Sequence, residues 1–215
     1  MNNKSKMSFG IFLLLTFLFI EFNVENDTVE LQRFDQYFIN LLGRSVTNTN
    51  TELFKIVSLF GSPLFSIGAT MIICLWLIAH NDCFKAFWII SIQLSGSTVV
   101  EIIKQIVARL RPFHQLVVDR GYSFPSGHTF CTTILILTIF YLVIPKIGDE
   151  EFRLIVVLLG ITWIGVVATS CVYLGNHFAS DVFASLFLAS GYWCIIVPYE
   201  KKVVRMIRPL WSKRN

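Results

Sequence analysis

Three clusters of ionisable and hydroxyl side chains interrupt an otherwise apolar sequence. In chain order they are Lys104 and Arg111, then Ser126, Gly127 and His128, and finally Ser170, His177 and Asp181. Ionisable groups beside apolar segments cost free energy, so such groups usually mark a functional site. Their residue types are those that bind a phosphate and transfer it.

The first two clusters suit an anion. Lys104 and Arg111 are seven residues apart, which on a helix is two turns, so both side chains are expected to point the same way. Two fixed cations that face one place suit a phosphate. The segment Pro125-Ser126-Gly127 is typical of a helix start, with proline as its first residue, where free backbone N–H groups and a glycine let an anion approach closely.

The histidines suit acid–base and nucleophilic chemistry. His177 and Asp181 are four residues apart, so on a helix they would lie on one face. A carboxylate bonded to one ring nitrogen fixes the tautomer and leaves the other nitrogen free to react. With His128 as a second imidazole, two histidines allow a division of labour, one as nucleophile and one as general acid. Each cluster alone also has a structural reading, as snorkelling cations, a helix cap or a structural His–Asp pair. From the residues alone, phosphatase chemistry and phosphate binding both remain open.

The composition identifies the elements that must position these residues. The chain has 215 residues, of which 54% are hydrophobic and 15% charged, against a usual charged share of about 25%. So few charges exclude a water-soluble domain, and the same numbers exclude disorder, coiled coil and collagen. The net charge of +4 gives no support for nucleic-acid binding. Five cysteines without a C-x-x-C pair predict neither a disulfide framework nor a zinc site.

The apolar runs predict an all-α bundle of six membrane spans in one domain, residues 1–215. The spans are expected at about 7–22, 53–79, 84–107, 125–144, 152–174 and 178–197. The first lacks a small-residue cleavage site behind it and is therefore read as an uncleaved span. An irregularity is expected in the second span at Gly61 and Pro63. Between the first two spans, residues 28–50 predict an amphipathic interfacial helix, with apolar residues at Leu31, Phe34, Phe38, Leu41 and Leu42.

Six spans place both termini on one side of the membrane. Basic residues are more frequent on that face, so we expect the termini in the cytoplasm and all three clusters at the outer face. The basic tail contributes Lys201, Lys202, Arg205, Arg208, Lys213 and Arg214, and could also touch anionic lipid. A transporter is disfavoured because it would need polar residues near the bilayer middle.

The three clusters, in this order, resemble the signature of the type 2 phosphatidic acid phosphatase superfamily, a family of integral-membrane lipid phosphatases. The motifs read Lys104-QIVARL-Arg111-Pro112, Pro125-Ser126-Gly127-His128, and Ser170-Cys171-VYLGN-His177-FAS-Asp181. They lie within residues 104–181, from the third span to the sixth. A six-span architecture is also what the resemblance implies.

The resemblance also implies a mechanism that uses no metal and no other cofactor. His177 would be the nucleophile that forms a phosphohistidine, Asp181 would orient and polarise it, and His128 would protonate the leaving group. The phosphoryl oxygens would be held by Lys104, Arg111, Ser126, Gly127 and Ser170. Fixed cations and N–H groups would then stabilise the charge of the transition state.

One position departs from the family pattern, because Cys171 stands where the third motif has an arginine. A thiol cannot replace a cationic phosphoryl donor, whose loss costs about 2.7–4 kcal/mol. Three explanations are open: Arg109 or Arg120 supplies the charge, the chain is an altered or engineered form, or it is a weakened enzyme that mainly binds lipid phosphate. Cys171 as a nucleophile in its own right is disfavoured, because the sixth residue after it is His177 and not arginine.

The sequence therefore predicts a lipid phosphatase in a bacterial cell membrane. The substrate classes are phosphatidylglycerophosphate, phosphatidic acid and an isoprenyl diphosphate such as undecaprenyl diphosphate. A catalytically silent lipid-phosphate binding protein is the alternative, motivated by Cys171. The sequence does not indicate an oligomeric state.

Overall fold

The computed structural model describes residues 2–200 and 202–204, and throughout these residues the regular structure is helical. The α-helices are α1 (Asn3–Glu25), α2 (Val29–Gly43), α3 (Asn48–Phe60), α4 (Pro63–Ala79), α5 (Cys83–Val107), α6 (Gly127–Val143), α7 (Glu150–Tyr173) and α8 (Ala179–Ile196). Short 3-10 turns, Ile144–Lys146 and Val197–Tyr199, follow α6 and α8. The basic-tail residues Lys201, Arg205, Arg208, Lys213 and Arg214 lie outside the described residues.

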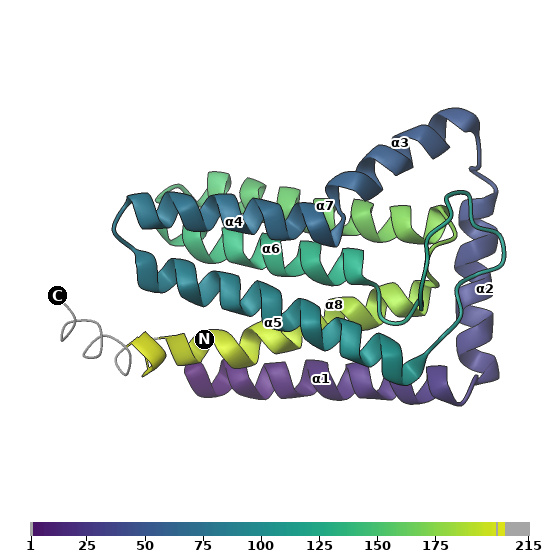
Figure 1. Ribbon diagram of the computed structural model, residues 1–215, viewed down its shortest axis with the longest axis horizontal. Coiled ribbons are helices and arrows are strands. Elements are labelled where there is room, and N and C mark those ends of the chain that lie inside the picture. The colour runs from purple at the N-terminus through teal and green to yellow at the C-terminus, as the bar shows by residue number, and fades with distance from the viewer. Residues whose placement is uncertain (1, 201, 205–215) are drawn as a thin grey trace.

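The predicted all-α bundle of membrane-spanning helices is confirmed. Among the described residues, five helices are long and apolar enough to cross a bilayer. They are α1, α5 and α7, together with α6 and α8 when each is extended by its 3-10 turn. The pair α3 and α4 passes the same test when taken together, and it is bent by 44° at the predicted irregularity. Counted as one span, this pair gives the six that were predicted. In Figure 1 the long helices run side by side, and the N-terminus and the end of α8 lie at the same end of the bundle.

Small residues let the spans pack closely, as is usual between helices in a membrane. Gly10 of α1 and Gly191 of α8 face each other, and a Cβ at Gly191 would lie 3.0 Å from the Gly10 carbonyl oxygen. Gly160 of α7 meets the ring of Phe140 on α6 in the same way, since a Cβ there would lie 2.4 Å from a ring carbon. The most buried span is α6, whose Phe130 and Ile134 are fully enclosed.

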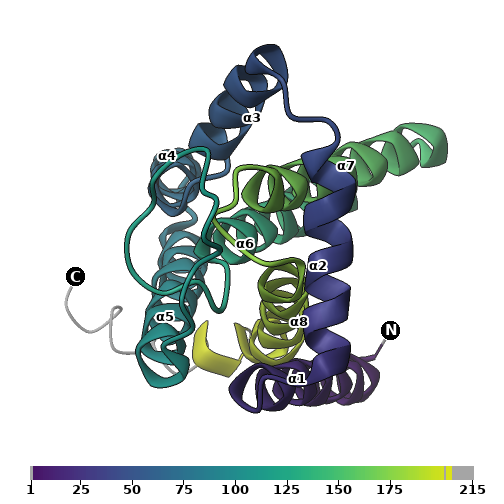
Figure 2. The same ribbon diagram turned by 90° about the vertical axis from the view of Figure 1, so that its right-hand side faces the viewer.

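The helix α2 lies across one end of the bundle, roughly at right angles to the spans (Figures 1 and 2). The predicted interfacial helix is therefore present, although it ends at Gly43 and not near Asn50, where α3 has already begun. Leu31, Phe38 and Leu42 pack on the buried cores of the bundle. The segment between α5 and α6, residues 108–126, is irregular and lies at the same end as α2 (Figure 1).

The break between α3 and α4 is fixed by a buried hydrogen bond. Thr132 of α6 donates its hydroxyl to the Gly61 carbonyl at 3.0 Å. Gly61 is also tightly packed, because a Cβ there would lie 2.5 Å from a methyl group of Val167. A bent span leaves carbonyl groups at the bend without helical partners, and a hydroxyl from a neighbouring helix satisfies one of them.

We expect Thr132→Val to lower the free energy of unfolding by about 1–3 kcal/mol, since it leaves a buried carbonyl without its donor. The matched control is Thr133→Val on the same helix, whose equally buried hydroxyl only reaches back to the Thr129 carbonyl at 2.7 Å. Thermal unfolding of the detergent-solubilised variants measures the difference. Equal midpoints for the two variants would show that the contact does not stabilise the bend.

Candidate active site

All three clusters meet at the end of the bundle that α2 crosses. There α5 ends, α6 begins, and α7 turns into α8, with the segment 108–126 between them (Figure 2). The Leu116 N–H donates to the Leu174 carbonyl at 2.9 Å and ties this segment to the α7–α8 turn. Residues as far apart in the chain as Lys104 and Asp181 therefore lie at the same end of the bundle.

His177 lies in the tight turn between α7 and α8. The N–H groups of Asn176 and His177 both donate to the Cys171 carbonyl, at 3.1 and 3.2 Å. Gly175 permits the turn through its positive φ of 72°. The imidazole of His177 is buried, with 1% of the residue exposed. Its Nδ1 faces Asp181 and its Nε2 faces Arg111, so the two ring nitrogens have different neighbours.

Asp181 lies in the first turn of α8, behind His177. Its Oδ2 accepts the Phe178 N–H at 2.9 Å and lies 3.6 Å from Nδ1 of His177. The expectation that this pair shares one helix face was wrong, because α8 begins at Ala179 and His177 precedes it. The pair meets instead across the helix start, where the exposed N–H groups favour a carboxylate.

The pKa of His177 is lowered from its usual value, chiefly because burial disfavours the charged imidazolium. The nearby Asp181 opposes this shift, and the positive charges of Arg111 and Lys104 add to it. A lowered pKa keeps the ring neutral at physiological pH. Its Nε2 lone pair is therefore available to react.

Arg111 faces Nε2 of His177 at 3.4 Å through its Nη1 atom. The same Nη1 donates to the Asn176 carbonyl at 2.6 Å, and Nη2 forms an ion pair with Asp119 at 3.0 Å. Lys104 donates to the Tyr122 carbonyl at 3.2 Å. The helical spacing argument for Lys104 and Arg111 was wrong, since α5 ends at Val107 and Arg111 lies on the irregular segment. Both cations nevertheless belong to the same end of the bundle.

The second cluster forms the start of α6. The helix begins at Gly127, and Ser126 is its N-cap. Pro125 was expected to be the first helical residue, but it lies before the N-cap. The Ser126 hydroxyl accepts hydrogen bonds from Thr129, from its N–H at 3.4 Å and its hydroxyl at 3.2 Å. His128 follows in the first turn, and its ring centroid lies 6.4 Å from that of His177.

Asp119, His128 and His177 have possible metal-ligand atoms within 4.8 Å of one another. The residue types alone would allow a divalent cation there. Arg111, however, pairs with Asp119 and borders His177, so a cation would meet a fixed positive charge. The surroundings of the two rings therefore favour an anion.

The first two residues of the third motif, Ser170 and Cys171, bring no charge to the site. Ser170 donates its hydroxyl back into α7, to the Val167 carbonyl at 2.7 Å. Cys171 is fully buried, and its Sγ lies 3.9 Å from the Ser126 hydroxyl at the start of α6. Arg109 does not face Cys171, since its guanidinium is bound by Asp35 and Asp181. Arg120 is exposed and meets Arg111 through its backbone carbonyl.

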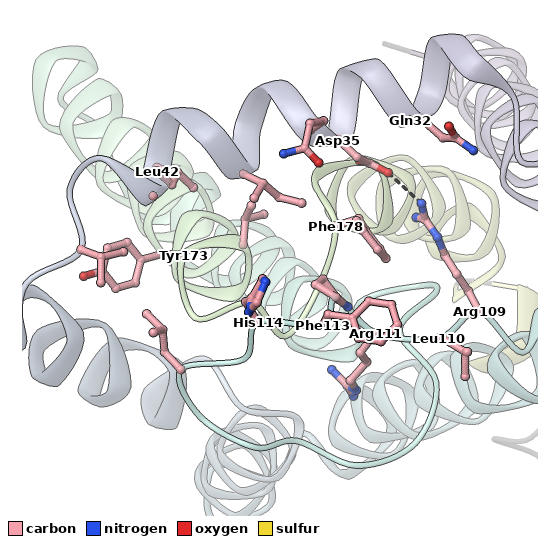
Figure 3. Close-up of a pocket in the computed structure, with 18 of the residues that line it drawn as sticks. Gln32, Asp35, Leu42, Arg109, Leu110, Arg111, Phe113, His114, Tyr173 and Phe178 are labelled. Atoms are coloured by element: carbon pink, nitrogen blue, oxygen red, sulfur yellow. Dashed lines mark hydrogen bonds and ion pairs between the residues drawn. The ribbon is translucent and has the colours of Figure 1, made fainter.

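A cavity of about 930 Å³ lies between α2 and the segment 108–126. Figure 3 shows Gln32, Asp35 and Leu42 on the α2 side, facing Arg109 and Arg111. Its volume is in the range of ligand pockets. Arg111 borders both this cavity and His177, so the cavity adjoins the site.

Sequence reasoning missed two acidic residues that contact the site. Asp119 pairs with Arg111, and its place in an irregular segment gave no signal. Asp35 pairs with Arg109 and did carry a signal. It occupies the same helical stripe as Leu31, Phe38 and Leu42, which is a place for apolar side chains. A charge within such a stripe indicates a buried partner.

Comparisons with known proteins identify the family of the chain and a solved structure with the same fold. A family model described as the PAP2 superfamily matches residues 85–205, more than half of the chain. The fold matches the crystal structure of the first transmembrane PAP2 type phosphatidylglycerolphosphate phosphatase from Bacillus subtilis. That match has a TM-score of 0.79 at 20% identity and covers 90% of this chain and 96% of the other.

A curated relative is phosphatidylglycerophosphatase B of Bacillus subtilis (strain 168). It is 27% identical over 108 residues, which are 49% of this chain and 53% of the relative. The match thus spans about half the length of that protein.

We expect Gly175→Ala to destabilise the site far more than Gly121→Ala. Both glycines have positive φ, of 72° and 80°, so alanine brings a strain of about 1–2 kcal/mol at either. A Cβ at Gly175 would also lie 2.3 Å from the His114 carbonyl oxygen, whereas one at Gly121 meets nothing within 4 Å. Thermal unfolding checks the contrast, and similar midpoints would contradict the packing of the turn.

Proposed function

The chain belongs to the PAP2 superfamily, and on this premise we propose that it is a lipid phosphatase. The observation that supports this most is the placement of His177 between Asp181 on one ring nitrogen and Arg111 on the other. A carboxylate behind a neutral imidazole and a cation in front of it suit attack on a phosphoryl group. The single domain, residues 1–215, holds the whole site.

In the first step, Nε2 of His177 attacks the phosphorus atom and the P–O bond to the leaving group breaks. A phosphohistidine forms, and its positive ring is stabilised by Asp181 at Nδ1. His128 gives a proton to the leaving oxygen, which departs as an alcohol or a phosphate. In the second step, His128 takes a proton from water, which attacks the phosphohistidine and releases inorganic phosphate and neutral His177.

The charge of the transition state would be held without a metal. Lys104 and Arg111 provide two cations, and the start of α6 at Gly127 provides backbone N–H groups. Ser126 and Ser170 are the neutral donors of this proposal. Their hydroxyl groups now donate to Cys171 Sγ and to the Val167 carbonyl, so each would have to turn before it donates to a phosphoryl oxygen.

The substrate we propose is a phosphate or diphosphate carried by a membrane lipid. The names of the two relatives favour phosphatidylglycerophosphate, with phosphatidic acid and undecaprenyl diphosphate as the other candidates. The cavity beside Arg111 would receive the headgroup. The site lies at the end of the bundle opposite the N-terminus (Figure 1), and the basic residues favour cytoplasmic termini and a site that faces outward in a bacterial cell membrane.

We expect His177→Ala to reduce phosphate release from these lipids to the background rate, because the nucleophile is lost. His128→Ala should lower release by about 10²–10⁴-fold, as is usual for a general acid. The matched control is His80→Ala, an exposed histidine just beyond the end of α4. Release that persists in His177→Ala, or that falls equally in His80→Ala, would contradict the proposed mechanism.

Cys171 favours a second function, a lipid-phosphate binding protein with little or no catalysis. If only the third cation is missing, Cys171→Arg should raise phosphate release by about 10²–10³-fold. Cys171→Ser is the control, because it is similar in size and adds no charge. Release that is absent in the starting protein and present in Cys171→Arg supports the binding protein. Strong release before substitution contradicts it.

A further inference from the structure

Asp35 is a buried charge on the interfacial helix α2. Only 2% of the residue is exposed, and it lies within the apolar stripe of that helix. Burial raises the pKa of its carboxyl from the ordinary value, while Arg109 and the hydrogen bonds from Ser180 oppose this. The carboxylate can therefore keep its charge only through these partners.

Both oxygens of Asp35 have partners from other elements. Oδ2 forms an ion pair with Nη2 of Arg109 at 2.7 Å and accepts the Ser180 hydroxyl at 2.8 Å. Oδ1 accepts the Ser180 N–H at 2.8 Å. Asp35 thus binds both the irregular segment 108–126 and the first turn of α8, next to Asp181.

Arg109 bridges two carboxylates, Asp35 and Asp181, and Figure 3 shows its contact with Asp35. While Nη2 binds Asp35, Nη1 binds Asp181 at 2.5 Å and the Ser180 hydroxyl at 2.8 Å. The guanidinium also lies 4.0 Å over the ring of Phe178. Its planar fork suits two acceptors at once, which a lysine ammonium on a flexible stem could not hold in the same way.

We propose that Asp35 is a positioning residue for the reaction at His177, acting through Arg109 and Asp181. The inference rests on the proposed function and adds to it a contribution from α2. The family model begins at residue 85, so Asp35 lies outside the segment that it matches.

The charge of Asp35 matters because Arg109 is shared. With Asp35 present, two carboxylates divide one guanidinium, and Asp181 keeps negative charge to direct at Nδ1 of His177. Without Asp35, the full positive charge of Arg109 would act on Asp181 alone. The imidazolium character that develops as His177 attacks phosphorus would then be less stabilised.

Other charges also act on His177 and must stay constant in a test. They are Lys104 on α5, His128 on α6, Asp181 on α8, and Arg109, Arg111 and Asp119 on the segment 108–126. A neutral substitution at Asp35 leaves all of these in place. Asp35 also lines the cavity beside Arg109, so KM is measured with kcat to separate headgroup binding from positioning of His177.

The test compares Asp35→Asn with Glu30→Gln, which removes the same charge from an exposed position on the same helix. Two quantities are measured on the full-length protein in detergent: kcat and KM for phosphate release, and the ¹⁵N NMR titration of the His177 ring. The chain has four histidines, so His177→Gln assigns the signal.

In Asp35→Asn we expect kcat to fall about 10- to 100-fold, by analogy with the hydrogen-bond partners that orient metal-binding residues from behind, with little change in KM. The titration midpoint of His177 should move to lower pH, because a negative charge near the ring is lost. Arg109→Gln removes a positive charge and should move it to higher pH. Glu30→Gln should change neither quantity.

An unshifted His177 midpoint in folded Asp35→Asn would overturn the positioning role, whatever the activity. If Asp35→Asn does not fold, Arg109→Gln decides by the direction of its shift, and failure of both to fold would leave Asp35 a purely structural role. Absent phosphate release from the starting protein, together with the expected NMR shifts, would refute the phosphatase and not the link between Asp35 and His177.

Discussion

The guanidinium of Arg109, held between Asp35 and Asp181, is the interaction on which the geometry of the site depends. The three charged groups of this interaction come from α2, from the segment 108–126 and from α8. The position of each of these elements therefore depends on the other two. In a buried environment each charge needs its partner, because an unpaired one is far more costly than on a surface. The pKa of Arg109 reflects the balance: burial lowers it, but the two carboxylates prevail and raise it.

The membrane explains why this network lies at one end of the molecule. Within the bilayer the backbone must satisfy its own hydrogen bonds, so helices are interrupted only where a side chain replaces the lost partner. Thr132 does so at the bend between α3 and α4, and Ser126 does so at the start of α6. Irregular backbone in a membrane protein is tolerated where it is buried in protein or lines a water-filled cavity. The segment 108–126, His128 and His177 lie where the helices end, beside the cavity under α2.

Periodicity and motif spacing predicted the helices and the residue types of the site, but not how those residues meet. The spans were predicted to within a few residues because apolar runs report directly on burial in lipid. His177 with Asp181, and Lys104 with Arg111, were expected on continuous helices, whereas each pair is joined across a helix end. A helix end depends on caps and tertiary contacts that spacing does not encode. Asp35 is the opposite case. Its place in the apolar stripe of α2 indicates from the sequence alone that its side chain is buried.

The cysteine at position 171 removes a cation, and Arg109 is too firmly held to replace it. A third phosphoryl donor would contribute about 2.7–4 kcal/mol to the transition state. Withdrawing Arg109 from its two carboxylates would break a buried ion pair, which costs about 3–5 kcal/mol. The two ranges overlap, so a phosphoryl contact gives Arg109 no clear net gain for leaving Asp35 and Asp181. In the proposed reaction, the transferred phosphoryl group would then be held by Lys104, Arg111 and the N–H groups at the start of α6.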